Sequence, residues 1–339
     1  MSQIGEMSST PPVLSLPSVP EQLSARLQEG LDEVDALLRR QVDHDDPFIA
    51  EANTHLIEAG GKRFRPLLTL LASELGTGIN PDVVASAAGV ELTHVASLCH
   101  DDVMDEAEVR RGAASANAKY GNSTAILVGD MLFGTASSII ADLGAEAVKL
   151  QAETFVRLCA GQIRDDRPSP SGQDPVDYYL GVLADKTGVL IATAAQYGAM
   201  FAGCDAVTVE IMREYGEQLG MAFQLADDLI DISSDVADLG KTPGTDLREG
   251  KRTLPVLYAM ASTDPADARL RELLQTELRD QALLDEALEL LRAHPAMEQA
   301  RAHTSTVATQ AQDALDPLPD SEAKTALRAL ATSVVTRVG

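Results

Sequence analysis

The sequence predicts an all-α protein, and three observations support this fold class. Alanine, the strongest helix former, occurs 49 times in 339 residues. Aromatic residues, which favour strands, make up only 4%, and tryptophan is absent. Apolar residues recur every three or four positions, as at Leu23, Leu27 and Leu31. We therefore expect a helical bundle.

The expected elements follow one another with few interruptions. Residues 1–20 contain four prolines among serine and threonine and are expected to form a flexible N-terminal tail. Residues 21–339 show no change of composition that marks a domain boundary, so we expect a single helical domain. After a first helix from about residue 21, helices are expected at 46–59, 64–75, 81–105, 122–142, 145–163, 175–202, 207–232, 254–262, 267–275, 281–292, 295–315 and 321–337.

The charge and the cysteines exclude several classes of protein. The formal net charge is −25, which argues against a nucleic-acid-binding protein because such proteins need a basic face. No apolar run approaches the roughly 18 residues of a membrane span, and the N-terminus does not resemble a signal peptide. Cys99, Cys159 and Cys204 are widely spaced, as expected of reduced thiols. We expect a cytoplasmic protein.

Two aspartate motifs lie within the helical pattern. Residues 101–105 and 227–231 both read DDxxD. On a helix, positions i and i+4 share a face and i+1 lies on its flank, so each motif groups carboxylates on an otherwise apolar helix. Such grouping is unfavourable unless a cation neutralises it, and oxygen ligands without His or Cys favour Mg²⁺. A solvated acidic stripe would explain one motif much better than two.

Basic residues, which are scarce in this chain, gather near these motifs and at the Gly/Pro breaks. They are Lys62, Arg63, Arg65, Arg110, Arg111, Lys186, Lys241, Lys251 and Arg252. Any one of them alone would be a solvated surface charge. Mg²⁺ bound by carboxylates commonly also binds substrate phosphates, so together these residues predict a site for a phosphorylated substrate.

Five motifs occur in a fixed order over about residues 50–260. They are Gly60-Gly61-Lys62-Arg63-Phe64-Arg65-Pro66, the stretch 91–112 with the first DDxxD, Lys186-Thr187-Gly188, the stretch 223–231 with the second DDxxD, and Gly240-Lys241 with Gly250-Lys251. This ordered set resembles the trans-polyprenyl diphosphate synthase family. The resemblance implies the isoprenoid synthase fold, with a central cavity flanked by the two DDxxD helices, and a homodimer. It also implies head-to-tail condensation of isopentenyl diphosphate with an allylic diphosphate, farnesyl or geranylgeranyl.

The same resemblance assigns roles to individual residues. Mg²⁺, three ions per active site, would be held by Asp101, Asp105, Asp227 and Asp231, with Asp102 and Asp228 in support. Isopentenyl diphosphate would be held by Lys62, Arg65, His94 and Arg111. The allylic diphosphate would be held by Arg110, Lys186, Thr187, Gln224, Lys241 and Lys251. Catalysis would rest on Asp101, Asp102, Asp105, Arg110, Lys186, Asp227 and Asp228, which stabilise the departing diphosphate without a side-chain nucleophile.

Small residues precede the first motif and bear on product length. Ser97, Thr93 and Gly89 lie at successive four-residue steps from Asp101, with Ala96 beside them. Gly89 lies roughly 18 Å from Asp101 along a helix, so this side of the groove has space for several isoprene units. The absence of large aromatics here resembles the long-chain branch, with products of about C30 to C50 for quinone side chains or polyprenyl lipids. The alternative is that small residues simply allow close helix packing.

Three further expectations concern the surroundings of the site. Phe133 is expected to cap the groove from the opposite helix, and release of the product implies transient contact with a membrane. The sequence departs from the family pattern at Gly161-Gln162-Ile163-Arg164-Asp165. Asp165 stands there at a position that often carries Gln, so the surroundings of the second metal site are expected to differ from those in the family.

Three alternative functions remain at this stage. A short-chain farnesyl or geranylgeranyl diphosphate synthase would share every motif. A class I terpene cyclase would need a different second metal motif and no isopentenyl diphosphate site. A non-catalytic prenyl-binding subunit would be expected to carry degenerate aspartate motifs, whereas both motifs are complete.

Overall fold

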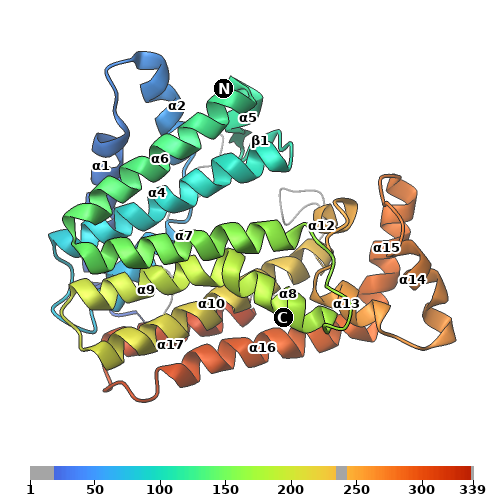
Figure 1. The fold of residues 1–339 in the computed structure, drawn as a ribbon. Helices are drawn as coiled ribbons and strands as arrows, with labels where there is room; N and C mark the ends of the chain where they lie inside the picture. Colours follow the sequence, from blue (N-terminus) through green and yellow to red (C-terminus); the bar gives the residue numbers. More distant parts are fainter. Residues whose placement is uncertain (1–18, 234–242, 337–339) are drawn as a thin grey trace, which may run out of the picture. The chain divides into compact units, whose positions relative to one another are not determined.

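Nearly all regular structure in this computed structural model is helical, which confirms the all-α prediction (Figure 1). The structure describes residues 19–233 and 243–336. The longer helices are α1 (Glu21–Val42), α2 (Pro47–Glu58), α3 (Phe64–Ser73), α4 (Pro81–Met104), α6 (Asn122–Asp142), α7 (Ala145–Asp165), α8 (Pro175–Leu183), α9 (Val189–Phe201), α10 (Ala206–Ser233), α15 (Gln281–Ala293), α16 (Pro295–Ala314) and α17 (Glu322–Thr336). The shorter elements are β1 (Val109–Arg110), β2 (Ala113–Ala114), α5 (Ala116–Tyr120), η2 (Ala184–Gly188), α12 (Thr245–Arg248), α13 (Leu254–Met260), η3 (Pro265–Asp267) and α14 (Ala268–Leu273). The strands β1 and β2 form one antiparallel pair.

The chain divides into two compact units. The first contains the residues up to Phe155, together with Leu190–Gly216 and Leu315–Ala329. The second contains Val156–Val189, Glu217–Ala314 and Leu330–Gly339. The first DDxxD motif belongs to the first unit and the second motif to the second unit. The single domain over residues 21–339 therefore stays a prediction, as does a cavity flanked by both motifs. Of the predicted N-terminal tail, residues 1–18 lie outside the described residues.

Helix α4 is the central element of the first unit. It packs against α6, α3 and α1. It begins where the Asn80 side chain accepts hydrogen bonds from two backbone amides, with Pro81 at the first helical position. Most of its residues are buried, including Leu92, Val95 and Ala96, because apolar residues surround the helix rather than forming one stripe. The core thereby fixes the direction of the helix that carries the first aspartate motif.

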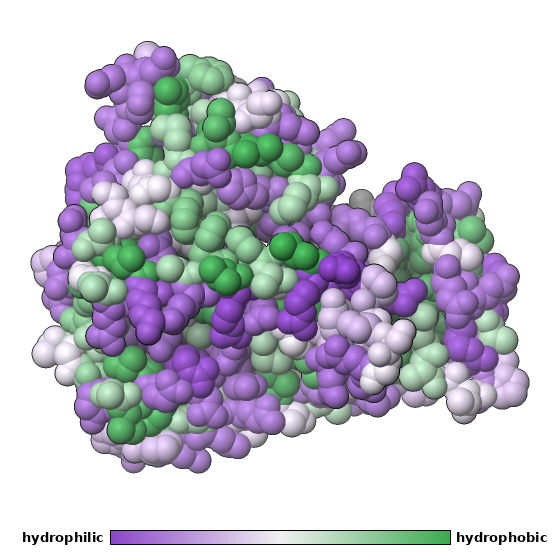
Figure 2. Space-filling model, viewed as in Figure 1, coloured by the Kyte–Doolittle hydropathy of each residue, from purple (hydrophilic) through white to green (hydrophobic). Residues whose placement is uncertain are grey.

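Helix α6 requires a correction to the expectation about membrane spans. By length and composition alone it could cross a membrane, with a mean hydropathy of 1.6 over its most apolar window. Its buried side, which includes Val128 and Leu132, packs against α4, so it is a core helix of the first unit. Its other side leaves Ile126, Leu127 and Met131 exposed, and Figure 2 shows hydrophobic atoms on this face.

The second unit contains an irregular turn in the middle of the expected helix 175–202. Helix α8 continues into the π-helical turn η2, which carries Lys186 and Thr187, and this turn leads into α9. Within a helix, a π-turn is a local widening that commonly coincides with functional residues. The prediction of one helix is therefore correct in extent, but it missed the widened turn.

Helices α3 and α9 of the first unit approach each other closely at Gly198. A Cβ atom at this position would overlap the backbone carbonyl oxygen of Thr69 and lie 2.8 Å from Cβ of Ala72. Since backbone atoms cannot move aside as a flexible side chain can, the contact requires glycine.

We predict that Gly198→Ala lowers the free energy of unfolding by about 1–3 kcal/mol, because the added methyl overpacks this contact. Gly134→Ala is the matched control, since nothing lies within 4 Å of a Cβ at that helical position. The control should leave stability unchanged or raise it by about 0.5–1 kcal/mol. Chemical denaturation of the two variants measures the difference, and equal stabilities would contradict the packing argument.

Candidate active site

The first aspartate motif occupies the last turn of α4. Asp102 is fully buried, and its Oδ1 accepts from Nε and Nη2 of Arg110 at 2.7 and 2.5 Å. Its Oδ2 is buried without a hydrogen-bond partner in the described chain. Asp101 is half-buried, and Asp105, the residue after the helix, is exposed. The motif therefore combines one buried structural carboxylate with two carboxylates that reach the surface.

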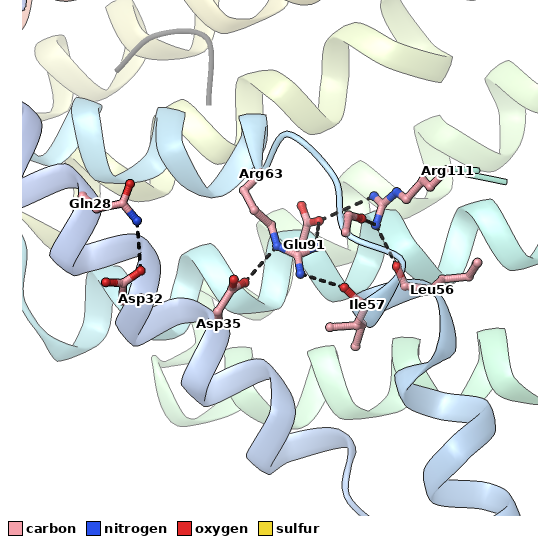
Figure 3. A network of polar contacts seen from close by, with 9 residues as sticks. Gln28, Asp32, Asp35, Leu56, Ile57, Arg63, Glu91 and Arg111 are labelled. Carbon is pink, nitrogen blue, oxygen red and sulfur yellow. Dashed lines mark hydrogen bonds and ion pairs between the residues drawn. The ribbon is translucent and has the colours of Figure 1, made fainter. Parts of the chain in front are cut away.

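A buried carboxylate, Glu91, organises the basic residues of the first unit (Figure 3). Nη1 of Arg63 lies 3.0 Å from Oε1 of Glu91, and Nη2 of Arg111 lies 3.7 Å from the same oxygen. Arg63 also donates to Asp35 and to the carbonyl of Ile57. Three protein acceptors thus engage Arg63, which indicates that this arginine holds the local structure.

The loop before α3 brings these arginines together through unusual backbone conformations. Arg63 and Arg111 have positive φ angles of 45° and 54°, a conformation that non-glycine residues seldom adopt. Gly61 has φ 147°, and a Cβ there would lie 2.9 Å from Cζ of Arg111. The carbonyls of Leu56 and Gly60 accept from Nη1 of Arg111 at 2.9 and 2.5 Å. The glycines of the Gly60–Pro66 motif thus allow the guanidinium to pack directly on the loop.

Arg65 and His94 lie inside this arginine cluster and have different electrostatics. Burial, together with the positive charges of Arg65, Arg111, Arg110 and Arg63, holds the pKa of His94 well below its usual range. Burial also lowers the pKa of Arg65 to about 10, so it remains a cation at neutral pH. Nε of Arg65 is buried and has no partner among the described residues. Such donors are normally satisfied by water or ligand, so the cluster fits an anion.

Asp165 joins two lysines in the second unit. Its Oδ2 lies 2.7 Å from Nζ of Lys186 and 3.1 Å from Nζ of Lys251, and Asp166 also contacts Lys251. Burial opposes the charge of Asp165, but the two lysines hold the pKa of its carboxyl below the usual range. In the sequence, Asp165 stood out only as a departure from the family pattern. In the structure it forms ion pairs with two residues that are predicted to hold the allylic diphosphate.

The second aspartate motif lies in a buried acidic environment. Asp228 accepts from Nε2 of Gln224 at 3.0 Å and from the hydroxyl of Tyr179, yet burial raises its pKa to about 7. Burial and the charges of Asp228 and Asp231 raise the pKa of Asp246 to about 8. The mutual repulsion of these carboxylates is the condition that a bound cation relieves.

Asp231 has a second role that the sequence did not reveal. Its two carboxylate oxygens accept from the backbone amides of Thr245 and Asp246 at 3.3 and 3.2 Å, so it caps the short helix α12. Predicted as a metal ligand, it therefore also fixes the segment that carries Asp246.

The described residues contain no group of three or more His, Cys, Asp or Glu side chains arranged to hold a metal ion. This is compatible with Mg²⁺, which commonly takes one or two carboxylates and completes its shell with water and substrate phosphates. The donor set, carboxylates without thiols, also suits this hard cation. The assignment of Asp101, Asp105, Asp227 and Asp231 as metal ligands stays a prediction.

The other residues predicted to hold the diphosphates differ in their surroundings. Lys62 is exposed, and Oγ1 of Thr187 lies 3.5 Å from Oε1 of Gln224, at the limit of a hydrogen bond. Lys241 lies outside the described residues, so its role stays a prediction.

Of the residues predicted to control product length, Ala96, Ser97 and Thr93 lie along α4 and Phe133 lies on α6, both in the first unit. Ala96 and Thr93 are buried, and Ser97 is 9% exposed. A narrow cavity lined by Gly89 and Thr93 lies on the same face. Ile140 from α6 occupies the space beside Gly89, 2.7 Å from where a Cβ would be, so small residues here serve helix packing as well. Phe133 stacks on Phe155, with ring centroids 3.9 Å apart, and its role as a cap stays a prediction.

Comparison with known proteins identifies the family. The model of the polyprenyl synthetase family matches residues 46–291, which include both aspartate motifs and both basic clusters. The chain belongs to the polyprenyl synthetase family. It is therefore a prenyltransferase with the isoprenoid synthase fold, as the motifs predicted.

Relatives of this polyprenyl synthetase differ in the product that their names state. A nonaprenyl diphosphate synthase of Mycobacterium tuberculosis is 46% identical over 93% of this chain and 95% of its own length. A geranylgeranyl pyrophosphate synthase from Corynebacterium glutamicum, complexed with calcium and isoprenyl diphosphate, has a TM-score of 0.85 at 43% identity, covering 94% of this chain and 98% of the other. A decaprenyl diphosphate synthase from Rhodobacter capsulatus has a TM-score of 0.86 at 35% identity, with coverage of 94% and 99%.

The lowered pKa of His94 predicts a pH dependence of stability. An unfolded histidine takes up a proton near pH 6.5, whereas folded His94 stays neutral until a lower pH. Between these two values the unfolded state binds more protons, so the stability of this polyprenyl synthetase should fall as pH falls below about 6.5. In His94→Gln, the free energy of unfolding measured by denaturation from pH 7.5 to 5 should decline less steeply. An identical decline in both proteins would contradict the burial of a neutral imidazole.

Proposed function

We propose that this polyprenyl synthetase adds isopentenyl diphosphate repeatedly to farnesyl or geranylgeranyl diphosphate and forms a long all-trans chain of about C30 to C50. One observation carries the proposal: each unit has its own cationic cluster, Arg65 with Arg111 in the first and Lys186 with Lys251 in the second. A synthase that joins two diphosphates needs two such sites. A terpene cyclase, which acts on one diphosphate, needs only one.

The clusters divide the binding of the two substrates. In the first unit, Arg65 offers an unpaired Nε and neutral His94 offers ring nitrogens, while Arg111 and Lys62 add positive charge; these residues hold isopentenyl diphosphate. In the second unit, Lys186, Thr187, Gln224 and Lys251 hold the allylic diphosphate. Arg110, which belongs to the first unit, and Lys241, which lies outside the described residues, are assigned to the same substrate by the family resemblance alone. Mg²⁺, when bound, neutralises charge that develops on the departing diphosphate.

Fixed positive charge explains how these residues promote the reaction. As the allylic carbon–oxygen bond breaks, negative charge moves onto the diphosphate, and ammonium groups that are already in place stabilise it without reorganisation. Asp165 holds Lys186 and Lys251 in one position before substrate binds. The carbocation is then attacked by the double bond of isopentenyl diphosphate, and transfer of a proton from the new cation to the departed diphosphate forms the new double bond and completes one addition.

The length of the product is the finer part of the proposal. The small residues Ser97, Thr93 and Gly89 support a long chain, as does the similarity to a nonaprenyl diphosphate synthase. The narrowness of the cavity at Thr93 and the similarity to a geranylgeranyl pyrophosphate synthase favour a C20 product as the second candidate.

The cellular setting completes the proposal. We infer a cytoplasmic homodimer that binds three Mg²⁺ per active site and touches a membrane only when product leaves. Cys99, Cys159 and Cys204 are not joined in disulfides, which supports a reducing compartment.

An assay with Mg²⁺, labelled isopentenyl diphosphate and farnesyl or geranylgeranyl diphosphate tests the proposed activity. Products of C30 or longer support the long-chain assignment, whereas accumulation of C20 would establish the second candidate. No incorporation with either primer would refute the proposed reaction.

We predict that Asp101→Asn and Asp227→Asn each reduce turnover by about 10²-fold to 10³-fold, because each removes charge that stabilises the transition state. Thermal unfolding should show that both variants remain folded. Asp316→Asn, a surface carboxylate near the C-terminus, is the control and should retain full turnover. Retained activity in both motif variants would end the metal-site assignment.

We also predict that Ala96→Phe or Ser97→Phe shortens the product, because a ring at either position fills the groove within about 8 Å of Asp101 along α4. Chromatography of the dephosphorylated products measures their length. Unchanged product length in both variants would refute the role of the small residues.

A further inference from the structure

Two arginines of α7 bind the carboxylate that lies directly before Lys186 in the chain. Nε of Arg157 donates to Oδ1 of Asp185 at 2.9 Å, and Nη1 of Arg164 donates to Oδ2 of the same carboxylate at 2.8 Å. Each oxygen of Asp185 is thus engaged by a different arginine. Asp185 is the second residue of the π-helical turn η2, and Lys186 is the third. We call Arg157, Arg164 and Asp185 the arginine clamp.

The arginine clamp lies on the face of α7 that touches the π-helical turn. Arg157, Gly161 and Arg164 are four and three residues apart, so they share one face of the helix. A Cβ at Gly161 would lie 2.5 Å from the backbone nitrogen of Lys186 and 2.8 Å from the carbonyl carbon of Asp185. Backbone therefore lies against backbone at this point, with one arginine on either side of it along α7.

The same turn is held from α10. Nη2 of Arg157 lies 2.8 Å from Oε1 of Glu217, so its guanidinium joins carboxylates on two different elements. At the end of the turn, a Cβ at Gly188 would lie 3.2 Å from the carbonyl oxygen of Glu217. These contacts fix η2 to both α7 and α10 within the second unit.

Helix α8 orients the other arginine. Cζ of Arg164 lies 5.0 Å from the ring centroid of Tyr178, and the hydroxyl of Tyr178 donates to the carbonyl of Arg164 at 3.0 Å. A guanidinium that stacks on an aromatic ring has a defined direction. The side chains of Arg157 and Arg164 are 42% and 34% exposed, and ion pairs of such groups contribute little to stability. Their convergence on one carboxylate is better explained by the position that it imposes on the turn.

The position of Lys186 depends on the width of this turn. The backbone amide of Val189 donates to the carbonyl of Ala184, five residues back, instead of four as in an α-helix. Each helical residue adds about 100° of rotation, so relaxation of the turn to α-helix would rotate the side chains after it relative to those before it. The observed turn places Nζ of Lys186 2.7 Å from Oδ2 of Asp165.

We propose that Asp185 is a positioning residue for Lys186, because the arginine clamp keeps the π-helical turn in the conformation that directs the Lys186 ammonium toward Asp165 and the allylic diphosphate. This inference rests on the proposed function, which assigns Lys186 to that substrate. Asp185 acts through Lys186. The residues proposed for isopentenyl diphosphate belong to the first unit, so the clamp affects the allylic substrate alone.

The first test is Asp185→Asn, which keeps the shape of the side chain and removes the charge that both arginines bind. The KM for the allylic diphosphate should rise about tenfold, because a displaced ammonium binds it less well. The KM for isopentenyl diphosphate should stay within about twofold. Titration calorimetry with Mg²⁺ and farnesyl thiodiphosphate, an analogue that ionises slowly, should show the same loss as a higher Kd.

Glu286→Gln is the matched control. Glu286 also accepts from one arginine, Arg269, through both carboxylate oxygens, and it lies at the surface of the second unit. This variant should leave both KM values unchanged. Equal changes of the two KM values in Asp185→Asn would show a general disturbance of the fold, and unchanged values would show no role for Asp185; either result overturns the inference.

The second test asks whether Arg164 acts through Asp185. Arg164→Gln alone should raise the KM for the allylic diphosphate, and in the Asp185→Asn background it should add nothing further, because the contact is already lost. Effects that multiply would mean that Arg164 acts on the substrate by its own charge, which contradicts the proposal. Should Asp185→Asn not fold, Arg164→Gln alone must still raise the allylic KM and spare that for isopentenyl diphosphate.

The outcomes separate this inference from the proposed function. If the unmodified protein incorporates no isopentenyl diphosphate, the proposed function itself fails, and the inference fails with it. If the unmodified protein makes prenyl products and the variants of Asp185 and Arg164 bind the allylic substrate as well as it does, only the role of the arginine clamp is refuted.

Discussion

The buried carboxylate of Glu91 is the charge on which the first unit depends. It lies among Arg63, Arg65 and Arg111, whose guanidinium groups would otherwise repel one another in a region of low dielectric. Removing one partner of such a buried group leaves an uncompensated charge, commonly at a cost of about 3–5 kcal/mol. Glu91 and Asp35, which also pairs with Arg63, are two carboxylates against three cations, however. The excess positive charge that remains makes the cluster suitable for a diphosphate.

The second unit also buries charged groups, but there the carboxylates outnumber the lysines. Asp165 draws Lys186 and Lys251 together, while Asp228 and Asp246 have raised pKa values because they are buried near other carboxylates. Lysines and clustered carboxylates in one unit match the two components, anion and cation, of the metal diphosphate that we propose as its ligand. The net charge of −25 therefore does not prevent the binding of a small anion, because the few cations are concentrated where they are needed.

The sequence predicted the fold and the motifs, but not most of the hydrogen bonds and ion pairs between their side chains. The helical periodicity around Leu23, and the Gly and Pro at the breaks, are local signals and predicted nearly every helix. The different roles of Arg63 and Arg65 could not be predicted from the sequence, because these arginines, two positions apart, differ only in which acceptors surround them in space. Asp246 was missed for a similar reason, since its raised pKa arises from burial beside residues 15 to 18 positions away.

The composition that predicted the fold also determines how the core of the first unit is filled. With so few aromatic residues, alanine and glycine lie on closely approaching helices, as at Gly89 and Gly198. The space beside a small residue is then occupied by a side chain of the facing helix, as Ile140 of α6 occupies the space at Gly89. Polar side chains in such a core bond to one another, as the hydroxyls of Thr154 and Thr193 do, because a buried hydroxyl without a partner keeps the full cost of desolvation. Small residues on α4 are therefore needed for helix packing whether or not they also make room for a product chain.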